Sequence, residues 1–556
     1  MQRNLAALAE KEYDLIVVGG GIFGVCAAWD AVQRGLSVAL LEQDDFSHAT
    51  SANHFRMIHG GIRYLQHADI PRIRQSSYER SAMLRVAPHL AHPLPIVIPT
   101  YGHGMQGKEL LQAGMLAYDF LTFDRNRVIQ DPQHRIPPAR IISRQECLAL
   151  FPGIKKEGLT GAGIFYDGQT HNPARLGLAF LKSAVEAGAD AANYLKMTGF
   201  LRQGNRVTGV QACDQFTDDV LDIRGRVVLN TTGPWAAWLL REKLNAPLIP
   251  EPTFSRDTCF IVKGQLTGKH ALTVLGRTKD PDALISRGHR HLFLVPWQGH
   301  TLVGVWHVVH KGRPEDFTVP EVDLVSFLDE INEAYPPLQL NLGDITRWMA
   351  GLVLFGENAE GQKDLSYGKR SQVIDHARED QVEGLVTLIG VRFTTARGMA
   401  EKAVDVVFHK LGRKPPRSRT AFTPVHGGQF GMFEDLLQVA LKSRPLAVPV
   451  DAMPSLVHNH GSAYPEVLAY LQQDPALAST LGTSPVLKAE VLHAVRREMA
   501  HKLSDVVFRR TDLGSASYPG DIALRASADL MAAELGWNAA RLQRELDQVK
   551  SFYVNY

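Results

Sequence analysis

Residues 13–42 read YDLIVVGGGIFGVCAAWDAVQRGLSVALLE. The stretch begins with a continuous apolar run, which is typical of a strand buried on both faces of a parallel sheet. It passes through Gly19, Gly21 and Gly24 in the spacing Gly-x-Gly-x-x-Gly, continues as a helix, and ends in a second apolar run followed by Glu42. This order of strand, glycine turn, helix, strand and acidic residue predicts a Rossmann-like dinucleotide-binding fold.

Each residue of this motif has a physical reason for its position. Gly19 allows a tight turn, Gly21 lets a pyrophosphate approach the backbone, and Gly24 lets the helix pack closely against the strand. The N-terminus of the helix offers N–H groups and a positive dipole to the phosphates. Glu42 follows Gly24 by 18 positions, which is where an acid that binds a ribose hydroxyl is expected.

The segment after Glu42 separates FAD from NAD as the cofactor. A simple NAD-binding unit would continue with another helix and strand, but residues 49–65 read ATSANHFRMIHGGIRYL. This sequence is small and polar and then turns through Gly60 and Gly61, and such a loop suits the close approach of backbone to a flat ring system. The cofactor is therefore predicted to be FAD.

Distinctive blocks of sequence continue almost to the end of the chain. They are GGGIFG (19–24), LLEQDDF (40–46), ATS…MIHGGIRYL (49–65), VLNTTGPWA (228–236), FLVPW (293–297), GVRFTTARGMAEKAV (390–404), EMAHKLSDVVFRRTDLG (498–514) and LMAAELGW (530–537). Together these blocks resemble the FAD-dependent glycerol-3-phosphate dehydrogenase family, of the aerobic, quinone-linked type. The resemblance implies a phosphorylated alcohol as substrate, hydride transfer to flavin N5, and a quinone or another electron acceptor.

The resemblance also implies roles for individual residues. Those implied to bind FAD are Gly19, Gly21, Gly24, Glu42, Thr50, Ser51, His59, Gly60, Gly61, Gly233, Gly390, Thr394 and Thr395. Those implied to bind the substrate, through its phosphate, are Arg63, Tyr64, Arg370 and Arg392. The glycine motif and Glu42 would hold the adenosine half of FAD, and residues 50–61 would line the isoalloxazine. No metal ligand is implied.

Three candidate catalytic residues follow: Arg63, Arg392 and His307. The two arginines would face the substrate phosphate, and His307 is a candidate base because imidazole titrates near neutral pH. The alternative for His307 is a histidine at the end of a strand pair that hydrogen-bonds to backbone. His59 is expected to pack on the flavin rather than to move protons.

Three places depart from the family pattern. Val353 stands where the family carries an arginine, residues 305–307 (Val-Trp-His) replace a Thr-Thr-Asp run, and residues 265–266 (Gln-Leu) replace a histidine. Loss of a bidentate arginine weakens the binding of a phosphate or an oxyanion. These changes leave the flavin chemistry intact and keep two alternatives open: an oxidase or dehydrogenase of another small acid, amine or polyol, or a non-catalytic flavin-binding subunit.

The bulk composition is that of an ordinary globular protein, with 45% hydrophobic and 21% charged residues. The formal net charge is +2, from 60 basic and 58 acidic residues, so the chain as a whole carries no field that would recruit nucleic acid. Its four cysteines are scattered and do not cluster with histidines. This argues against a metal site and fits a reducing compartment.

The sequence predicts a cytoplasmic protein. The N-terminal residues carry charges where a signal peptide needs an apolar run, and the longest apolar stretch, residues 15–29, is too short to span a bilayer. Peripheral contact with the inner face of a membrane stays open, as does a homodimer.

Residues 1–410 are predicted to form the FAD-dependent oxidoreductase region. Its FAD-binding parts are residues 13–66, 155–240 and 351–410, in approximate bounds. The insertions at about 67–150 and 250–350 are predicted to bind substrate, the first with helical stretches and the second as an antiparallel sheet.

The last part of the chain has a different pattern. Residues 411–419, rich in proline and charge, predict a linker, and the apolar spacing in residues 420–556 predicts a helical domain. The expected fold class is α/β, with a Rossmann-like FAD-binding domain, an antiparallel-sheet substrate domain and a C-terminal helical domain.

Overall fold

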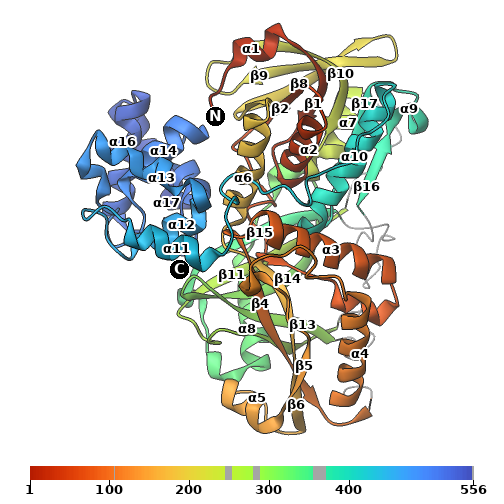
Figure 1. The fold of residues 1–556 in the computed structure, drawn as a ribbon, viewed down its shortest axis with the longest axis vertical. Coiled ribbons are helices and arrows are strands. Elements are labelled where there is room, and N and C mark those ends of the chain that lie inside the picture. The colour runs from red at the N-terminus through yellow and green to blue at the C-terminus, as the bar shows by residue number, and fades with distance from the viewer. Residues whose placement is uncertain (105–106, 245–252, 280–288, 355–370, 554–556) are drawn as a thin grey trace.

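The computed structural model describes the chain except for residues 105–106, 245–252, 280–288, 355–370 and 554–556. The described residues form two sheets, which lie one above the other in Figure 1, and a helical part beside them. The upper sheet contains the N-terminal strand, and the helical part, drawn in blue, contains the C-terminal residues.

The upper sheet is largely parallel. In spatial order its strands are β16 (Gln372–Asp375), β17 (Leu385–Ile389), β10 (Val220–Asn230), β1 (Glu12–Val18), β2 (Val38–Leu41) and β7 (Asp190–Ala192), and β8 (Leu195–Gln203) and β9 (Arg206–Asp214) extend it from β10. β1 runs parallel to both of its neighbours, with Val18 opposite Asn230 and Leu41. Residues 15–18 are buried, which explains their continuous apolar sequence.

Helices cover this sheet. One layer consists of α2 (Ile22–Gln33), α6 (Pro173–Glu186) and α10 (Ala396–Lys410), and the other face is covered in part by α1 (Leu5–Glu10) and α7 (Ala236–Leu244). α2 begins after Gly21 and is buried along most of its length, with Trp29 packed edge-on against Phe180 of α6. The turn from β1 into α2 therefore lies at the carboxyl end of the parallel strands, where α/β folds bind ligands.

The lower sheet is mostly antiparallel. In spatial order its strands are β15 (Ile345–Leu354), β11 (Thr253–Lys263), β14 (His300–Lys311), β13 (His289–Trp297), β12 (Ala271–Lys279), β4 (Ala91–Tyr101), β6 (Leu159–Thr170) and β3 (Met57–Ile58), and β5 (Arg140–Ser143) pairs with β6. Its accompanying helices are α3 (Ile70–Val86), α4 (Lys108–Leu121), α5 (Arg144–Leu150) and α8 (Glu321–Ala334). The sheet thus includes strands that come from well outside residues 250–350.

The chain then crosses from α10 to the helical part. Its helices are α11 (Phe433–Lys442), α12 (Ala452–His460), α13 (Tyr464–Leu468), α14 (Lys488–Glu498), α15 (Leu503–Asp505), α16 (Asp521–Leu535) and α17 (Ala539–Ser551). A π-helical turn, Val506–Arg510, follows α15. Figure 1 shows these helices packed beside the upper sheet rather than extended away from it. Among the described residues, none of the helices has the length and apolar character that crossing a membrane requires.

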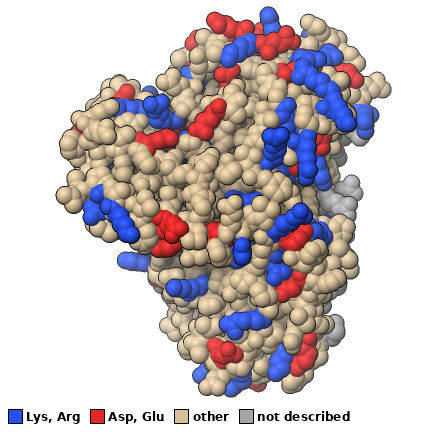
Figure 2. All heavy atoms as spheres, viewed as in Figure 1, with Lys and Arg blue, Asp and Glu red and all other residues tan. Residues whose placement is uncertain are grey.

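Basic residues at the end of α10 and just after it are paired with carboxylates. Lys410 Nζ lies 2.5 Å from Asp375 Oδ1, and Arg413 Nη2 lies 3.2 Å from Asp14 Oδ1. Figure 2 shows Lys and Arg side chains grouped towards the upper right of the viewed face, with acidic side chains among them. The charges of these two residues are thus balanced by carboxylates of the FAD-binding region, and the linker at residues 411–419 stays a prediction.

Candidate functional site

A cavity of about 2000 Å³ lies where the carboxyl ends of the upper strands meet the lower sheet. Its wall includes the glycine turn, parts of residues 41–51, the segment 231–235 and the segment 388–394. From the lower sheet, residues of several strands line it, among them alternate residues of β14 and the end of β15. The cavity is therefore built from both sheets, and each contributes a different chemistry.

The glycine turn presents backbone to this cavity. Gly19 has φ +106°, and a Cβ there would lie 2.8 Å from the carbonyl oxygen of Thr231. At Gly24 a Cβ would lie 1.9 Å from the carbonyl oxygen of Gly19, so the helix could not pack against the turn with any side chain at this position. Gly21 lines the cavity, and Ile22 N at the start of α2 donates to Ser51 Oγ at 3.0 Å.

Glu42 is held at the turn by two backbone hydrogen bonds. Its carboxylate accepts from Gly20 N at 2.6 Å and from Asp44 N at 2.9 Å, and the residue lines the cavity. Burial raises the pKa of Glu42 to about 7, although the two N–H groups act in the opposite direction. A ligand hydroxyl that donates to this carboxylate would favour its ionised form.

The loop that follows crosses from the upper sheet to the lower one. Thr50 Oγ1 donates to the carbonyl oxygen of Leu352 in β15 at 3.1 Å, and His59 N donates to Thr394 Oγ1 at 3.2 Å. Thr50, His59 and Thr394 all line the cavity. Two segments far apart in the sequence are thus joined directly at the wall.

Gly60 lies behind this wall. Its N–H donates to Asp167 Oδ1 at 2.6 Å, and a Cβ would lie 2.2 Å from Arg80 Nη1. Arg80 and Asp167 form a buried ion pair at 2.8 Å. Gly61, with φ +86°, lines the cavity. The Gly-Gly pair therefore turns the chain over a buried charge pair, which sequence reasoning missed because its two members lie 87 positions apart.

His59 stays neutral at physiological pH in this position. Burial lowers its pKa to about 3, with further contributions from Arg392, Arg63 and Arg80. Its Nδ1 is buried and has no hydrogen-bond partner among the described residues, and its ring centroid lies 6.1 Å from that of Tyr64. Arg63, Arg80 and Arg392 thus lie near the neutral imidazole ring of His59.

Arg392 and Arg63 are two of these cations, and both line the cavity. Arg392 Nη1 donates to Ser76 Oγ at 2.9 Å and to Tyr64 Oη at 3.3 Å, and its guanidinium lies 5.4 Å from the centre of the Tyr64 ring. Arg63 is exposed towards the cavity. Arg370 lies outside the described residues.

His307 faces the cavity from β14 and is paired with a carboxylate. Its Nδ1 lies 2.7 Å from Asp257 Oδ1 of β11, and both residues line the cavity. Val305 and Val353 also line it, whereas Trp306 turns to the other face and stacks on Phe327. The alternation of strand side chains explains this division. Sequence reasoning missed Asp257, since only the strand pairing brings it opposite His307.

The remaining candidates divide between the cavity wall and the layer behind it. Gly233 and Gly390 line the cavity, and a Cβ at Gly390 would lie 2.1 Å from the ring of Phe23. Thr395 is buried behind the wall, where its hydroxyl donates to the carbonyl oxygen of Arg392 at 3.2 Å. Residues 265–266, where the sequence departs from the family, do not line this cavity.

These residues fit FAD. Gly19 has no room for a side chain, Gly19 and Gly21 both present backbone to the cavity, and Glu42 lines the cavity as well. Parts of the loop at residues 50–61 and the segment 388–394, which leads into α10, lie along the same cavity. An elongated dinucleotide needs this combination of a backbone cradle, an acid and a second, ring-sized space.

Comparisons with known proteins identify the family of the chain. A family model described as FAD dependent oxidoreductase matches residues 14–406, and the C-terminal domain of alpha-glycerophosphate oxidase matches residues 418–542. A glycerol-3-phosphate dehydrogenase of Synechocystis sp. is 30% identical over 560 residues, which cover 99% of this chain and 98% of that protein. The mitochondrial glycerol-3-phosphate dehydrogenase of Mus musculus is 30% identical over 579 residues, covering 97% and 73%.

One solved structure matches the fold of nearly the whole chain. The glycerol-3-phosphate dehydrogenase from Bacillus halodurans, complexed with FAD, superposes with a TM-score of 0.77 at 24% identity, covering 99% of this chain and 97% of that one. The chain belongs to the FAD-dependent oxidoreductases, and the predictions of fold class, enzyme class and FAD are confirmed. Within that class it belongs to the glycerol-3-phosphate dehydrogenase family, as its sequence blocks indicated.

Proposed function

We propose that this protein oxidises glycerol 3-phosphate, or a closely related phosphorylated alcohol, at its secondary hydroxyl. The observation that carries the proposal is the meeting of Arg63 and Arg392 with the His307–Asp257 pair around one cavity that fits FAD. The named relatives, which match almost the full chain, support the same substrate.

The two arginines bind the phosphate of the substrate. A guanidinium carries its charge at any physiological pH and donates in a fork that matches phosphate oxygens. Arg392 is preorganised by Ser76 and Tyr64, so little side-chain freedom is lost when the anion binds. Arg63, more exposed, approaches the same end of the cavity.

His307 removes the hydroxyl proton. Asp257 accepts a hydrogen bond from Nδ1, which places the lone pair of the neutral ring on Nε2. FAD, when bound, accepts the hydride from the carbinol carbon. His59 is a poor base at this site because its pKa is about 3.

We also assign the two halves of FAD. The adenosine ribose binds at Glu42, the pyrophosphate at the turn of Gly19 and Gly21, and the flavin along residues 50–61 and the start of α10. The assignment rests on the carboxylate held by Gly20 N and Asp44 N, and on the lack of Cβ space at the turn.

Anaerobic reduction of the flavin tests the proposed substrate. Glycerol 3-phosphate should bleach the flavin absorbance of the purified protein within one turnover, and glycerol without phosphate should do so far more slowly. Absence of bleaching by glycerol 3-phosphate would exclude this function. Reoxidation by a soluble quinone, compared with reoxidation by oxygen, then identifies the electron acceptor.

The apolar lining at Val305 and Val353 favours a second candidate, a smaller acid, amine or polyol. These side chains can neither pair a phosphate nor polarise a hydroxyl. In this case small hydroxy acids, amines and polyols should bleach the flavin faster than glycerol 3-phosphate does.

A further inference from the structure

The Arg-Arg-Thr-Asp-Leu-Gly block of the C-terminal domain reaches back to the FAD-binding region. Arg509 and Arg510, at the end of the π-helical turn, both contact Asp45. Arg509 Nε lies 2.6 Å from Oδ2, and Arg510 binds in a fork, with Nη1 2.7 Å from Oδ2 and Nη2 2.7 Å from Oδ1. Asp45 is fully buried, and it follows Glu42 by only three positions.

Further groups complete this buried cluster. Asn193 Nδ2 donates to Asp45 Oδ1 and to the carbonyl oxygen of Met499, both at 2.9 Å. Asp505 Oδ1 lies 2.6 Å from Arg509 Nη2 and accepts from Tyr194 Oη at 2.6 Å. Burial alone would raise the pKa of Asp45, but the two guanidiniums outweigh it and hold this pKa well below its ordinary value. The carboxylate is therefore ionised and fully paired.

The same loop forms part of the cavity wall. Glu42, Gln43, Asp44 and His48 line the cavity, whereas Asp45 points away from it towards the C-terminal domain. The backbone of the loop is tied to the upper sheet, with Leu195 N donating to Glu42 O at 2.8 Å. One face of the loop thus meets the cofactor space, and the opposite face meets the arginine pair.

This arrangement couples the two domains through charge. A buried carboxylate that loses its partners becomes an uncompensated charge, which forces the surrounding chain to rearrange. Loss of Arg509 and Arg510 would therefore disturb the loop at residues 42–48, even though backbone hydrogen bonds to the upper sheet also hold it. Movement of the loop would displace Glu42 from the glycine turn, where Gly20 N now fixes its carboxylate.

We propose that Arg509 and Arg510 are positioning residues for the cofactor: the C-terminal domain holds the loop of residues 42–48 so that Glu42 meets the adenosine ribose of FAD. The inference rests on the assignment of the adenosine half made above. It gives the C-terminal domain a direct part in cofactor binding, although none of the three residues 45, 509 and 510 lines the cavity.

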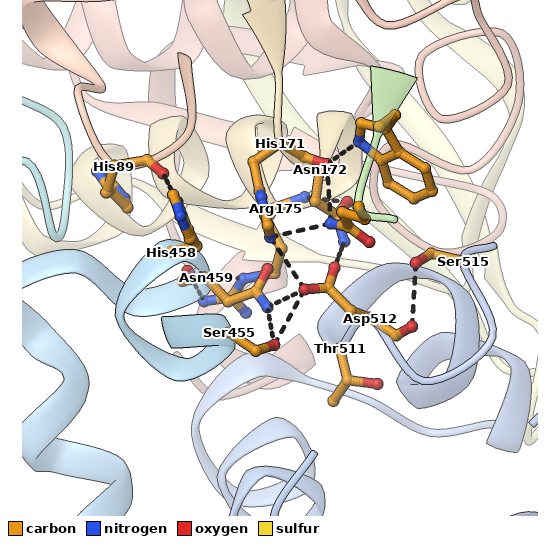
Figure 3. Close-up of polar contacts among 12 residues, drawn as sticks. His89, His171, Asn172, Arg175, Ser455, His458, Asn459, Thr511, Asp512 and Ser515 are labelled. Atoms are coloured by element: carbon orange, nitrogen blue, oxygen red, sulfur yellow. Dashed lines mark hydrogen bonds and ion pairs between the residues drawn. The ribbon is translucent and has the colours of Figure 1, made fainter. Parts of the chain in front are cut away.

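The matched control is Asp512, which belongs to the same block and the same interface. Its carboxylate binds His171 Nε2 at 3.0 Å, Asn172 Nδ2 at 3.0 Å and Asn459 Nδ2 at 2.6 Å, as Figure 3 shows. Asn172 caps α6 and is not part of the cavity wall. Asp512→Asn therefore disturbs another contact between the same two domains without touching the cofactor loop.

The experiment measures binding of ADP, FMN and FAD to the full-length protein freed of its cofactor, together with thermal unfolding. In Asp45→Asn the dissociation constants for ADP and FAD should rise about tenfold or more, the factor expected for the loss of hydrogen bonds to a charged group. The dissociation constant for FMN, which lacks the adenosine half, should stay nearly unchanged. Arg510→Lys, which keeps the charge but loses the fork, should give a smaller rise. Asp512→Asn should lower the unfolding temperature and leave ADP binding unchanged.

Three results would overturn the inference, and two of them would report general destabilisation. One of these two is an equal rise for ADP and FMN in Asp45→Asn; the other is an equal rise for ADP in Asp45→Asn and Asp512→Asn. The third comes from Glu42→Gln, which separates the inference from its premise. If Glu42→Gln weakens ADP and Asp45→Asn does not, the positioning role alone is wrong. If Glu42→Gln leaves ADP unchanged, the placement of the ribose is wrong.

Discussion

Replacing Glu42 by glutamine should have two separate effects, one on the stability of the folded protein and one on its affinity for FAD. In the protein without FAD, one of the two backbone donors, Gly20 N or Asp44 N, would face the new NH₂ group instead of an oxygen. A buried N–H left without an acceptor costs about 1–3 kcal/mol. This cost falls on the stability of the folded protein and is present whether or not the cofactor is bound.

The cost to FAD binding is a separate quantity. If Glu42 accepts a hydrogen bond from the ribose, the change to glutamine removes a bond to a charged group, worth about 1.5–3 kcal/mol. The dissociation constant for FAD should then rise between about tenfold and a hundredfold, because 1.4 kcal/mol corresponds to a factor of ten. Fluorescence titration of the cofactor-free protein measures it, and thermal unfolding without FAD measures the first cost.

The pKa of about 7 adds a dependence on pH. Ribose hydrogen bonds favour the ionised carboxylate and so lower the pKa of Glu42 in the complex. Between the two pKa values FAD binding must release a proton, so the dissociation constant should rise by up to about tenfold for each unit by which pH falls below 7. Above pH 7 this contribution should be flat. Exposed Glu12, changed to glutamine, is the control. An unchanged dissociation constant in Glu42→Gln, with the same pH profile, would refute the reasoning.

Four further outcomes are expected. Arg63→Ala should raise the KM for glycerol 3-phosphate at least about tenfold in steady-state kinetics while FAD affinity stays the same, and a loss of FAD in this variant would contradict the assignment. Val353→Arg should speed flavin bleaching by glycerol 3-phosphate in stopped-flow kinetics. His307→Gln should slow anaerobic flavin reduction by a factor of about 10²–10⁴ and leave the FAD dissociation constant unchanged, so a rate near that of the unmodified protein would remove His307 as the base. Gly24→Ala should yield protein without bound FAD, because its Cβ would lie 1.9 Å from the Gly19 carbonyl oxygen, whereas Gly431→Ala, with no atom within 4 Å of its Cβ, should purify yellow.

The local part of the fold could be predicted from the sequence. Residues 13–42 form strand, turn, helix and strand in the expected order, because each element is specified by its own apolar pattern and glycines. The helical stretches expected within residues 67–150 are present, among them α3 and α4. These are features that depend on neighbours in the chain.

The composition of the lower sheet could not be predicted in the same way. β4 contains Pro93, Pro95 and Pro99, and proline in a sequence normally argues against a strand in the interior of a sheet. Their even spacing puts all the missing N–H donors on one side of the strand. β6 pairs along the other side over its full length, while β12 pairs with β4 only at residues 96–97. β4 is therefore a strand because of its pairing with β6 and β12 and not because of its local sequence preference.

The site shows the same limit. Glu42 and the glycines could be placed because their roles depend on spacing within one unit. Asp257 could not, since it meets His307 only through the register of β11 with β14. Asp45 and Arg510 form an ion pair although they lie 465 residues apart, and neither local sequence indicates this contact.

The upper sheet has a consequence for how the protein is made. β1 is synthesised well before its neighbour β10, which ends at Asn230, and before β17, which ends at Ile389. Asp45, in the loop after Glu42, can form its ion pair with Arg510 only after residue 510 has been synthesised, so the adenosine side of the cavity is completed late. We therefore expect cofactor loading to follow translation rather than accompany it. Until β10 has been synthesised, the apolar strand at residues 15–18 lacks its pairing partner on one side, and an unpaired strand edge of this kind is prone to aggregation.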